Sequence, residues 1–234
     1  MITPRRSADR GHANHGWLDT YYTFSFADYH DPDFMGFGPL RVINQDVVQP
    51  GQGFPTHGHR DMEIVTYVLE GAVAHRDSMG NGSSIRPGEL QLMSAGRGVT
   101  HSEFNPSDTE PLHLLQMWVH PRTRGTEPRY EQRDFPAAEL QGRLREVVSP
   151  DGRDGSLTLD QDARLHVGVL RPGDRVRHEL GEGRSAWLHV ARGSVRLGDE
   201  LLGPGDGAAL QDEEGLELEG VETADLVLWD LVGD

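Results

Sequence analysis

The sequence predicts an all-β protein made of two tandem barrels. Short apolar segments alternate with turns rich in glycine and proline, of which the chain has 29 and 14, and this pattern is typical of all-β sandwiches and barrels. The same order of segments and turns occurs twice along the chain. Two histidines one residue apart, followed by a third, add metal-binding side chains to the first copy.

Six segments are predicted to be strands, because they are apolar and are bounded by turn residues. They are Leu40–Val48, Glu63–Glu70, Leu112–Val119, Leu165–Leu170, Ser185–Ala191 and Ala224–Leu231. Neither face of the second strand is polar, so we expect it to be buried on both sides. The most helical stretch is Tyr130–Val148, where Pro136 suits a first helical turn and Gly142 limits the length.

The two halves of the chain are predicted to be copies of one unit. The shared landmarks are Pro50-Gly51 and Pro172-Gly173, His57 and His178, Gly71 and Gly193, and the turns Arg86–Glu89 and Gly203–Asp206. The second copy has no His-x-His pair, and no histidine follows Asp206. We therefore expect an N-terminal barrel with a metal site (1–125), a linker with a short helix (126–148) and a C-terminal barrel without metal ligands (149–234).

Composition excludes several classes of protein. The formal net charge of −16 argues against nucleic acid or an anionic membrane as the main partner. The absence of cysteine excludes disulfides, thiolate metal sites and a cysteine nucleophile. Arginines near the N-terminus are not followed by an apolar stretch, so a signal peptide is not predicted, and no segment is long enough for a transmembrane helix. We expect a cytoplasmic protein.

A candidate metal site lies in the first copy. His57 and His59 would point to the same face of an extended strand, and so would His101 and Glu103. If two such strands lie side by side in a barrel, three imidazoles and a carboxylate converge. Imidazole nitrogen and carboxylate oxygen are the usual ligands of divalent transition metals.

Two motifs in the first copy resemble those of cupins. Gly51-x5-His57-x-His59-x3-Glu63, followed by Gly71, is similar to the first cupin motif. Gly98-x2-His101-x3-Asn105 is similar to the second, although Gly96 stands where the usual pattern has proline. The resemblance implies double-stranded β-helix, or jelly-roll, barrels with a metal inside, and two copies imply a bicupin.

A denser resemblance is to the pirin family. It rests on Phe24–Tyr29, Gly38–Val42, Gly53-Phe54, His57–Glu63, His75–Ser78, Met93–Gly96 and His101–Glu103. It covers roughly Tyr22–His120, and only the domain pattern matches in the second half. The chain length is similar to that of bacterial pirin-like proteins described as quercetin 2,3-dioxygenases.

The resemblance implies four metal ligands, His57, His59, His101 and Glu103. Ordinary cupins use the glutamate of the first motif, here Glu63, and strand parity does not choose between the two glutamates. We follow the family pattern and interpret Glu63 as a residue of the barrel rim or one that orients a ligand. His75 is interpreted as a turn residue or as support for the ligands.

The function implied by the resemblance is a metal-dependent dioxygenase that opens the central ring of flavonols such as quercetin and releases carbon monoxide. One divalent transition metal per chain is expected, with iron first and manganese, cobalt, nickel, copper or zinc as alternatives. The flavonol would bind the ion as an anion through its 3-hydroxyl, and Glu103 is the candidate general base that takes the proton. Dioxygen is the second substrate.

Two other functions remain open from the sequence. Pirins are also described as regulators that contact other proteins, so quercetin turnover could be incidental. Cupins also host metal-dependent isomerases and hydrolases, and fold does not fix function.

Overall fold

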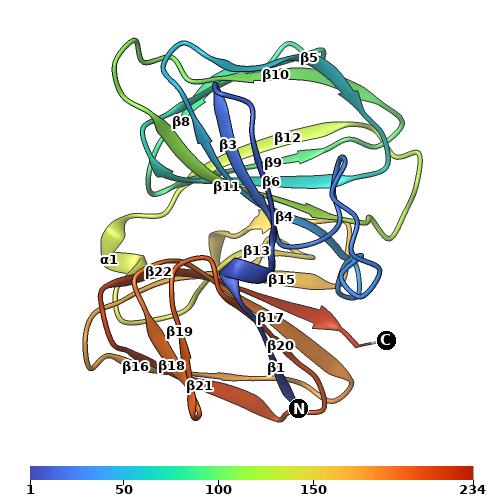
Figure 1. Cartoon of the computed structure of the whole chain (residues 1–234). Coiled ribbons are helices and arrows are strands. Elements are labelled where there is room, and N and C mark those ends of the chain that lie inside the picture. The colour runs from blue at the N-terminus through green and yellow to red at the C-terminus, as the bar shows by residue number, and fades with distance from the viewer. Residues whose placement is uncertain (234) are drawn as a thin grey trace.

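The protein consists of two β-barrels stacked on each other, as the computed structural model of residues 1–233 shows (Figure 1). Each barrel is built from a seven-stranded and a four-stranded sheet. Only α1 (Ala137–Leu140) and two 3-10 turns, η1 (Ser7–Asp9) and η2 (Arg153–Gly155), interrupt the strands of the described residues. No helix in the described part is long and apolar enough to cross a membrane.

The N-terminal barrel faces a large sheet with a small one. The large sheet runs β12 (Arg129–Asp134), β9 (Glu89–Ser94), β6 (Glu63–Glu70), β11 (Leu112–Val119), β4 (Leu40–Val48), β3 (Leu18–Tyr22) and β2 (Gly11–Asn14). The small sheet runs β5 (Gly53–His59), β10 (Val99–Phe104), β7 (Val73–Asp77) and β8 (Gly82–Ile85). Figure 1 shows β5 and β10 on the side away from the second barrel.

The C-terminal barrel repeats this plan. Its large sheet runs β1 (Ile2–Arg5), β20 (Gly207–Leu210), β17 (Arg184–Arg192), β22 (Ala224–Val232), β15 (Ala163–Leu170), β13 (Arg145–Ser149) and β14 (Leu157–Thr158). Its small sheet runs β16 (Arg175–Glu179), β21 (Gly215–Gly220), β18 (Val195–Leu197) and β19 (Glu200–Leu202). The all-β fold with two duplicated barrels is therefore confirmed, and the six predicted strands are all present.

The structure differs from the predicted division of the chain at two places. The first strand, β1, pairs with β20 of the C-terminal barrel. The stretch from Tyr130 to Val148 is mostly strand, with β12 pairing with β9 of the N-terminal barrel and a helix of only four residues. The sequence of β12, RYEQRD, is polar on both faces, so its strand identity depends on the partner edge and not on an apolar pattern.

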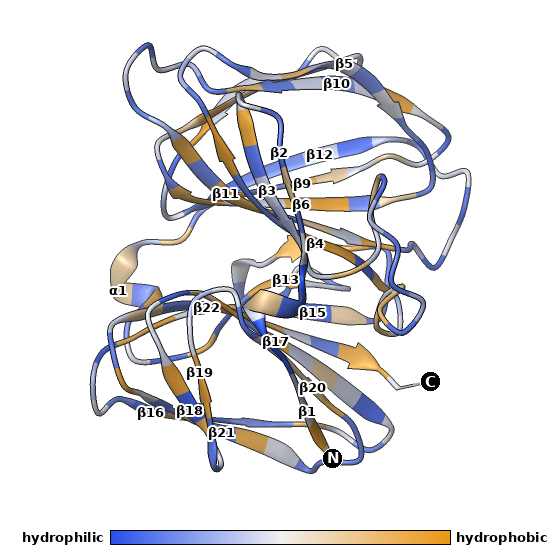
Figure 2. Cartoon of the chain, in the orientation of Figure 1, coloured by the Kyte–Doolittle hydropathy of each residue, from blue (hydrophilic) through white to orange (hydrophobic). Residues whose placement is uncertain are grey.

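The two barrels share one hydrophobic core. Side chains on alternate positions of β6 and β11, such as Val65 and Met117, point out of the first barrel and pack in one cluster with Leu165 and Trp229 of the second. The Trp229 indole N–H also donates to the Met117 sulfur at 3.3 Å. Strands of both large sheets are consequently buried on both faces, and Figure 2 shows the hydrophobic colour on strands and hydrophilic colour on the outer loops.

The interior of the N-terminal barrel is apolar at both ends and polar in the middle. Along β6, Ile64 belongs to one interior cluster and Val68 to another. Thr66 lies between them and donates toward Glu103 at 3.4 Å. Alternation along a single strand thus leaves one polar layer within the barrel, and the candidate ligands lie at this level.

Gly96, where the cupin pattern has proline, lies at a close approach of two chain segments. Its φ of +46° is in the left-handed region, and a Cβ atom there would come within 2.2 Å of the Thr126 carbonyl oxygen. Glycine is the residue that tolerates both conditions. The departure from the cupin pattern therefore has a local steric reason.

Candidate metal centre

Three imidazole rings meet on the small sheet of the N-terminal barrel. His57 and His59 lie two residues apart on β5 and so share one face, and the pairing of β5 with β10 sets His101 opposite His57. The Nε2 atom of His101 lies 3.0 Å from Nε2 of His59 and 3.1 Å from Nε2 of His57. The alternation predicted from the sequence therefore brings three ring nitrogens to one point.

The backbone fixes the tautomer of His57. Its Nδ1 lies 2.8 Å from the carbonyl oxygen of Pro55, beside a shift in the register of β5 and β10. Because a carbonyl oxygen can only accept, Nδ1 carries the proton and Nε2 presents a lone pair to the other rings. A second ring nitrogen held in this way is the usual arrangement for a metal-binding histidine.

Burial keeps two of the rings neutral. Burial, together with the adjacent imidazoles, lowers the pKa of His59 to about 4 and that of His101 to about 3. Protonating either ring would place a positive charge beside other imidazoles inside the barrel. Neutral imidazoles are the form that coordinates metals.

The donor set fits a divalent transition metal. Two nitrogens that each lie about 2.1 Å from one ion, at a right angle, are about 3.0 Å apart, and this is the spacing of the Nε2 atoms. With the Nε2 lone pair of His57 facing its neighbours, a cation satisfies the group better than hydrogen bonds between the rings. The side chains of His57, His59 and His101 form a group whose donor atoms all lie within 4.8 Å of one another.

Glu103 lies on the same face of β10, two residues beyond His101, and is 2% exposed. Gln91 donates to its Oε1 at 2.6 Å, and Gln116 donates to its Oε2 at 2.7 Å. Amide donors on both oxygens hold the carboxyl plane in place. Glu103 belongs to a second group of potential ligands, with His101 and His75.

His75 lies in the middle of β7, and its cross-strand neighbour is Glu103. It is buried, its ring stacks on Tyr130 with centroids 4.8 Å apart, and its Nε2 lies 3.3 Å from Asp77. The ring centroids of His75 and His101 are 5.4 Å apart. His75 therefore lies behind the three-histidine group, next to the two residues of β10.

Glu63 is turned away from the histidines. It opens β6 on the face that packs against the second barrel, and it accepts from the Ser94 hydroxyl at 2.7 Å and from the Asp160 amide at 3.4 Å. The even spacing of Glu63 from His57 and His59 did not separate it from Glu103, because β5 and β6 are strands of different sheets. Parity carries no information across the turn between them.

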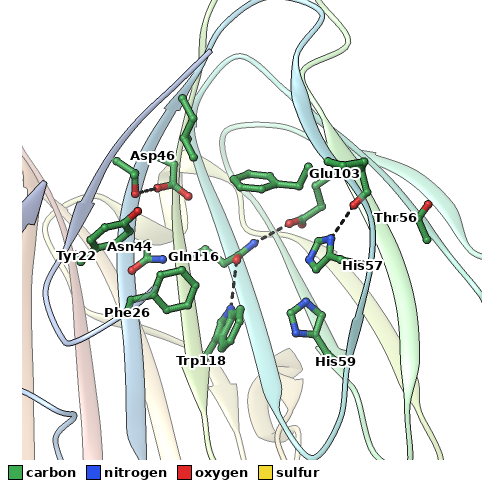
Figure 3. A pocket seen from close by; sticks show the side chains of 14 residues that line it. Tyr22, Phe26, Asn44, Asp46, Thr56, His57, His59, Glu103, Gln116 and Trp118 are labelled. Atoms are coloured by element: carbon green, nitrogen blue, oxygen red, sulfur yellow. Dashed lines mark hydrogen bonds between the residues drawn. The ribbon is translucent and has the colours of Figure 1, made fainter. Parts of the chain in front are cut away.

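A cavity of about 360 Å³ opens onto three of the four candidate ligands, His57, His59 and Glu103 (Figure 3). Its lining consists of Leu18, Thr20, Tyr22, Phe26, Asn44, Asp46, Phe54, Pro55, Thr56, His57, His59, Glu103, Gln116 and Trp118. The walls are mainly apolar and aromatic, and the volume lies in the range of small-molecule sites. Figure 3 shows His57, His59 and Glu103 on one side, and Asn44 and Asp46 on the other.

Comparisons with known proteins agree with this geometry. A family model described as Pirin matches residues 4–119, and one described as Quercetinase C-terminal cupin domain matches residues 146–231. The chain belongs to the pirin family. The predicted bicupin architecture is thereby confirmed.

Relatives of this pirin are similar along the whole chain. The quercetin 2,3-dioxygenase of Escherichia coli strain K12 is 50% identical over 231 residues, which cover 99% of each chain. The crystal structure of YhhW from Escherichia coli has a TM-score of 0.96 at 49% identity, covering 100% of this chain and 99% of that one. The bacterial pirin YhhW in complex with nickel(II), from the same organism, has a TM-score of 0.95 at 49% identity, covering all of both chains.

Several polar residues of the pirin's interior were not predicted from the sequence. Gln91 and Gln116 orient Glu103, and Asn44 and Asp46 line the far wall of the pocket. The available signal was a polar side chain at an inward position of an otherwise apolar strand, as at residues 44 and 46 of β4. Burying such a group is costly unless it has a partner or a purpose.

Proposed function

We propose that this pirin is a metal-dependent dioxygenase that opens the central ring of flavonols such as quercetin and releases carbon monoxide. The observation that carries the proposal is the group of three histidines, in which Nε2 of His101 lies 3.0–3.1 Å from the other two Nε2 atoms, at the edge of a cavity with aromatic side chains in its walls. The full-length likeness to a protein named quercetin 2,3-dioxygenase supports the same substrate class.

One divalent ion per chain would be held by His57, His59, His101 and Glu103. Iron is the first choice, with manganese, cobalt, nickel, copper and zinc as alternatives, because imidazole and carboxylate ligands suit all of them. A redox-capable ion would supply charge to stabilise the flavonolate and an electron path to dioxygen.

The protein's own residues would bind, orient and deprotonate the substrate. Phe26, Phe54 and Trp118 offer aromatic surface to a planar polyphenol and exclude water from it. Glu103, whose two oxygens already accept from Gln91 and Gln116, is the group that takes the proton of the 3-hydroxyl. Loss of that proton makes the flavonol electron-rich, which its reaction with oxygen requires.

The test is turnover by the purified, metal-loaded chain. Quercetin absorbance, oxygen uptake and carbon monoxide release should change together, with kcat/KM of about 10⁴ M⁻¹s⁻¹ or more. The zinc form should be nearly inactive, because a d¹⁰ ion has no redox chemistry. Equal rates with zinc and iron would refute the oxygen chemistry. Metal binding without turnover, together with stoichiometric capture of a protein, would favour a regulatory role.

A further inference from the structure

The wall of the pocket that faces the histidines carries two buried polar side chains. Asn44 and Asp46 lie two residues apart on β4, so both point into the barrel, and they are 4% and 3% exposed. Figure 3 shows them across the cavity from His57, His59 and Glu103. The residues that flank them on the same face, Val42 and Val48, are apolar.

These two side chains have unused hydrogen-bonding capacity within the described residues. Thr20 donates its hydroxyl to Oδ1 of Asp46 at 2.5 Å, and the Asp46 side chain lines the pocket. Oδ1 of Asn44 is buried without a hydrogen bond. Buried polar groups in native proteins are nearly always satisfied. An unsatisfied amide side chain that lines a pocket therefore indicates a ligand that forms hydrogen bonds with it.

The environment of Asp46 suits recognition of a hydroxyl group. Burial raises its pKa, the Thr20 hydroxyl lowers it and the nearby charge of Glu103 raises it, and together they place this pKa at about 7. Near neutral pH the carboxyl group can therefore both donate and accept. A phenolic hydroxyl, which also does both, is its natural partner.

We propose that Asn44 and Asp46 recognise phenolic hydroxyl groups at the end of the substrate opposite the histidines, and so select polyhydroxylated flavonols over less hydroxylated ones. The inference rests on the proposed function, since it assigns the far end of the same substrate. Apolar walls bind any flat ring system, but a buried polar side chain left unpaired penalises a substrate that cannot form a hydrogen bond with it.

The experiment compares quercetin with 3-hydroxyflavone, which keeps the 3-hydroxyl and lacks all the others. Wild-type protein should prefer quercetin in kcat/KM. The Asn44→Leu variant should lower this preference about tenfold. The double variant Thr20→Val/Asp46→Leu, which removes both partners of the buried hydrogen bond, should lower it by a similar factor. Dissociation constants from flavonol absorbance titrations of the metal-loaded protein without oxygen should change in parallel.

Leu18→Val is the matched control. Leu18 also lines the pocket but is apolar, so its substitution should change both substrates by the same factor. Thermal unfolding checks that each variant is folded. If the double variant does not fold, the result for Asn44→Leu alone decides whether the recognition role holds.

The outcomes separate the two proposals. If wild-type protein binds and turns over quercetin and the preference survives in folded Asn44→Leu protein, the recognition role is wrong and the dioxygenase proposal stands. If wild-type protein neither binds nor turns over either flavonol, the proposed function fails and this inference fails with it.

Discussion

The two barrels have the same topology, but equivalent strands of the small sheet carry different side chains. In the N-terminal barrel, β10 pairs with β5 so that His101 faces His57. In the C-terminal barrel, β21 pairs with β16 so that Leu216 faces His178, and Leu216 packs in an apolar interior. The fold therefore supplies the positions, and the side chains at those positions decide whether they form a site.

Asp230 is the centre of a hydrogen-bonded polar group in the C-terminal barrel. Asp230, which is 2% exposed, binds the Arg184 guanidinium and accepts from Nε2 of His178 at 3.0 Å. The hydrogen bonds of His178 and Arg184 lower the pKa of Asp230. Both three-residue groups of metal-ligand atoms in the described chain lie in the other barrel. An arginine provides the fixed positive charge here, which leaves no need for a cation.

The largest expected effect comes from removing the shared histidine. His101→Ala should reduce metal content from one ion per chain to near zero and abolish quercetin turnover, because His101 contacts both other rings. His178→Ala in the second barrel is the matched control and should keep both. Elemental analysis and activity measure the difference, and two ions per chain in wild-type protein would contradict the one-site comparison.

Breaking the ion pair of the second barrel should cost stability and leave the site intact. Arg184→Met leaves the buried charge of Asp230 without its main partner, and such losses are about 3–5 kcal/mol. Urea unfolding would show the change in the free energy of unfolding. Arg184→Met/Asp230→Leu should recover much of it, and no recovery would mean that packing, and not charge, explains the cost.

The two glutamates should differ in their effect on metal affinity. Glu103→Ala should weaken binding about 10–100-fold or more, because Glu103 is adjacent to the histidines, whereas Glu63→Ala should have little effect because Glu63 faces the second barrel. A titration against a competing chelator separates the two. Equal losses, or a larger loss at Glu63, would indicate the ordinary cupin ligand set.

The smallest expected effect is a pH dependence of opposite sign in the two barrels. The pKa of Asp46 is raised to about 7 in the folded protein, compared with about 3.9 in the unfolded chain. Its contribution to the free energy of unfolding is therefore fully present below about pH 3.9 and is lost as the pH rises through about 7. The pKa of Asp230 is lowered in the folded protein. Its contribution to the free energy of unfolding is therefore present above the unfolded-state pKa of about 3.9 and is lost as the pH falls through the folded-state pKa.

Thermal unfolding of the metal-free Asp46→Asn and Asp230→Asn variants at several pH values tests this comparison. Relative to wild type, Asp46→Asn should gain about 1 kcal/mol or more between pH 4 and 7. Asp230→Asn should be most destabilised near neutral pH and approach wild type in acid. Parallel pH curves for wild type and both variants would contradict both assignments.

Much of the candidate metal centre could be predicted from the sequence because it depends on local geometry. The His-x-His pair at residues 57 and 59 needs only an extended strand to put both rings on one face. The apolar strands and the glycine- and proline-rich turns likewise predict the duplicated barrels, since their signals lie within a few residues of chain. The crossing of β1 into the other barrel had no such signal.

Sequence alone determined the all-β architecture, its duplication, and the contrast between a histidine-rich and a histidine-poor copy, because these follow from periodicity and residue chemistry. Tertiary structure decided which glutamate lies by the histidines, where His75 lies, and that Asn44 and Asp46 form the opposite pocket wall. Each of these depends on which strands become neighbours across the barrel, and strand pairing joins residues that are far apart in the chain.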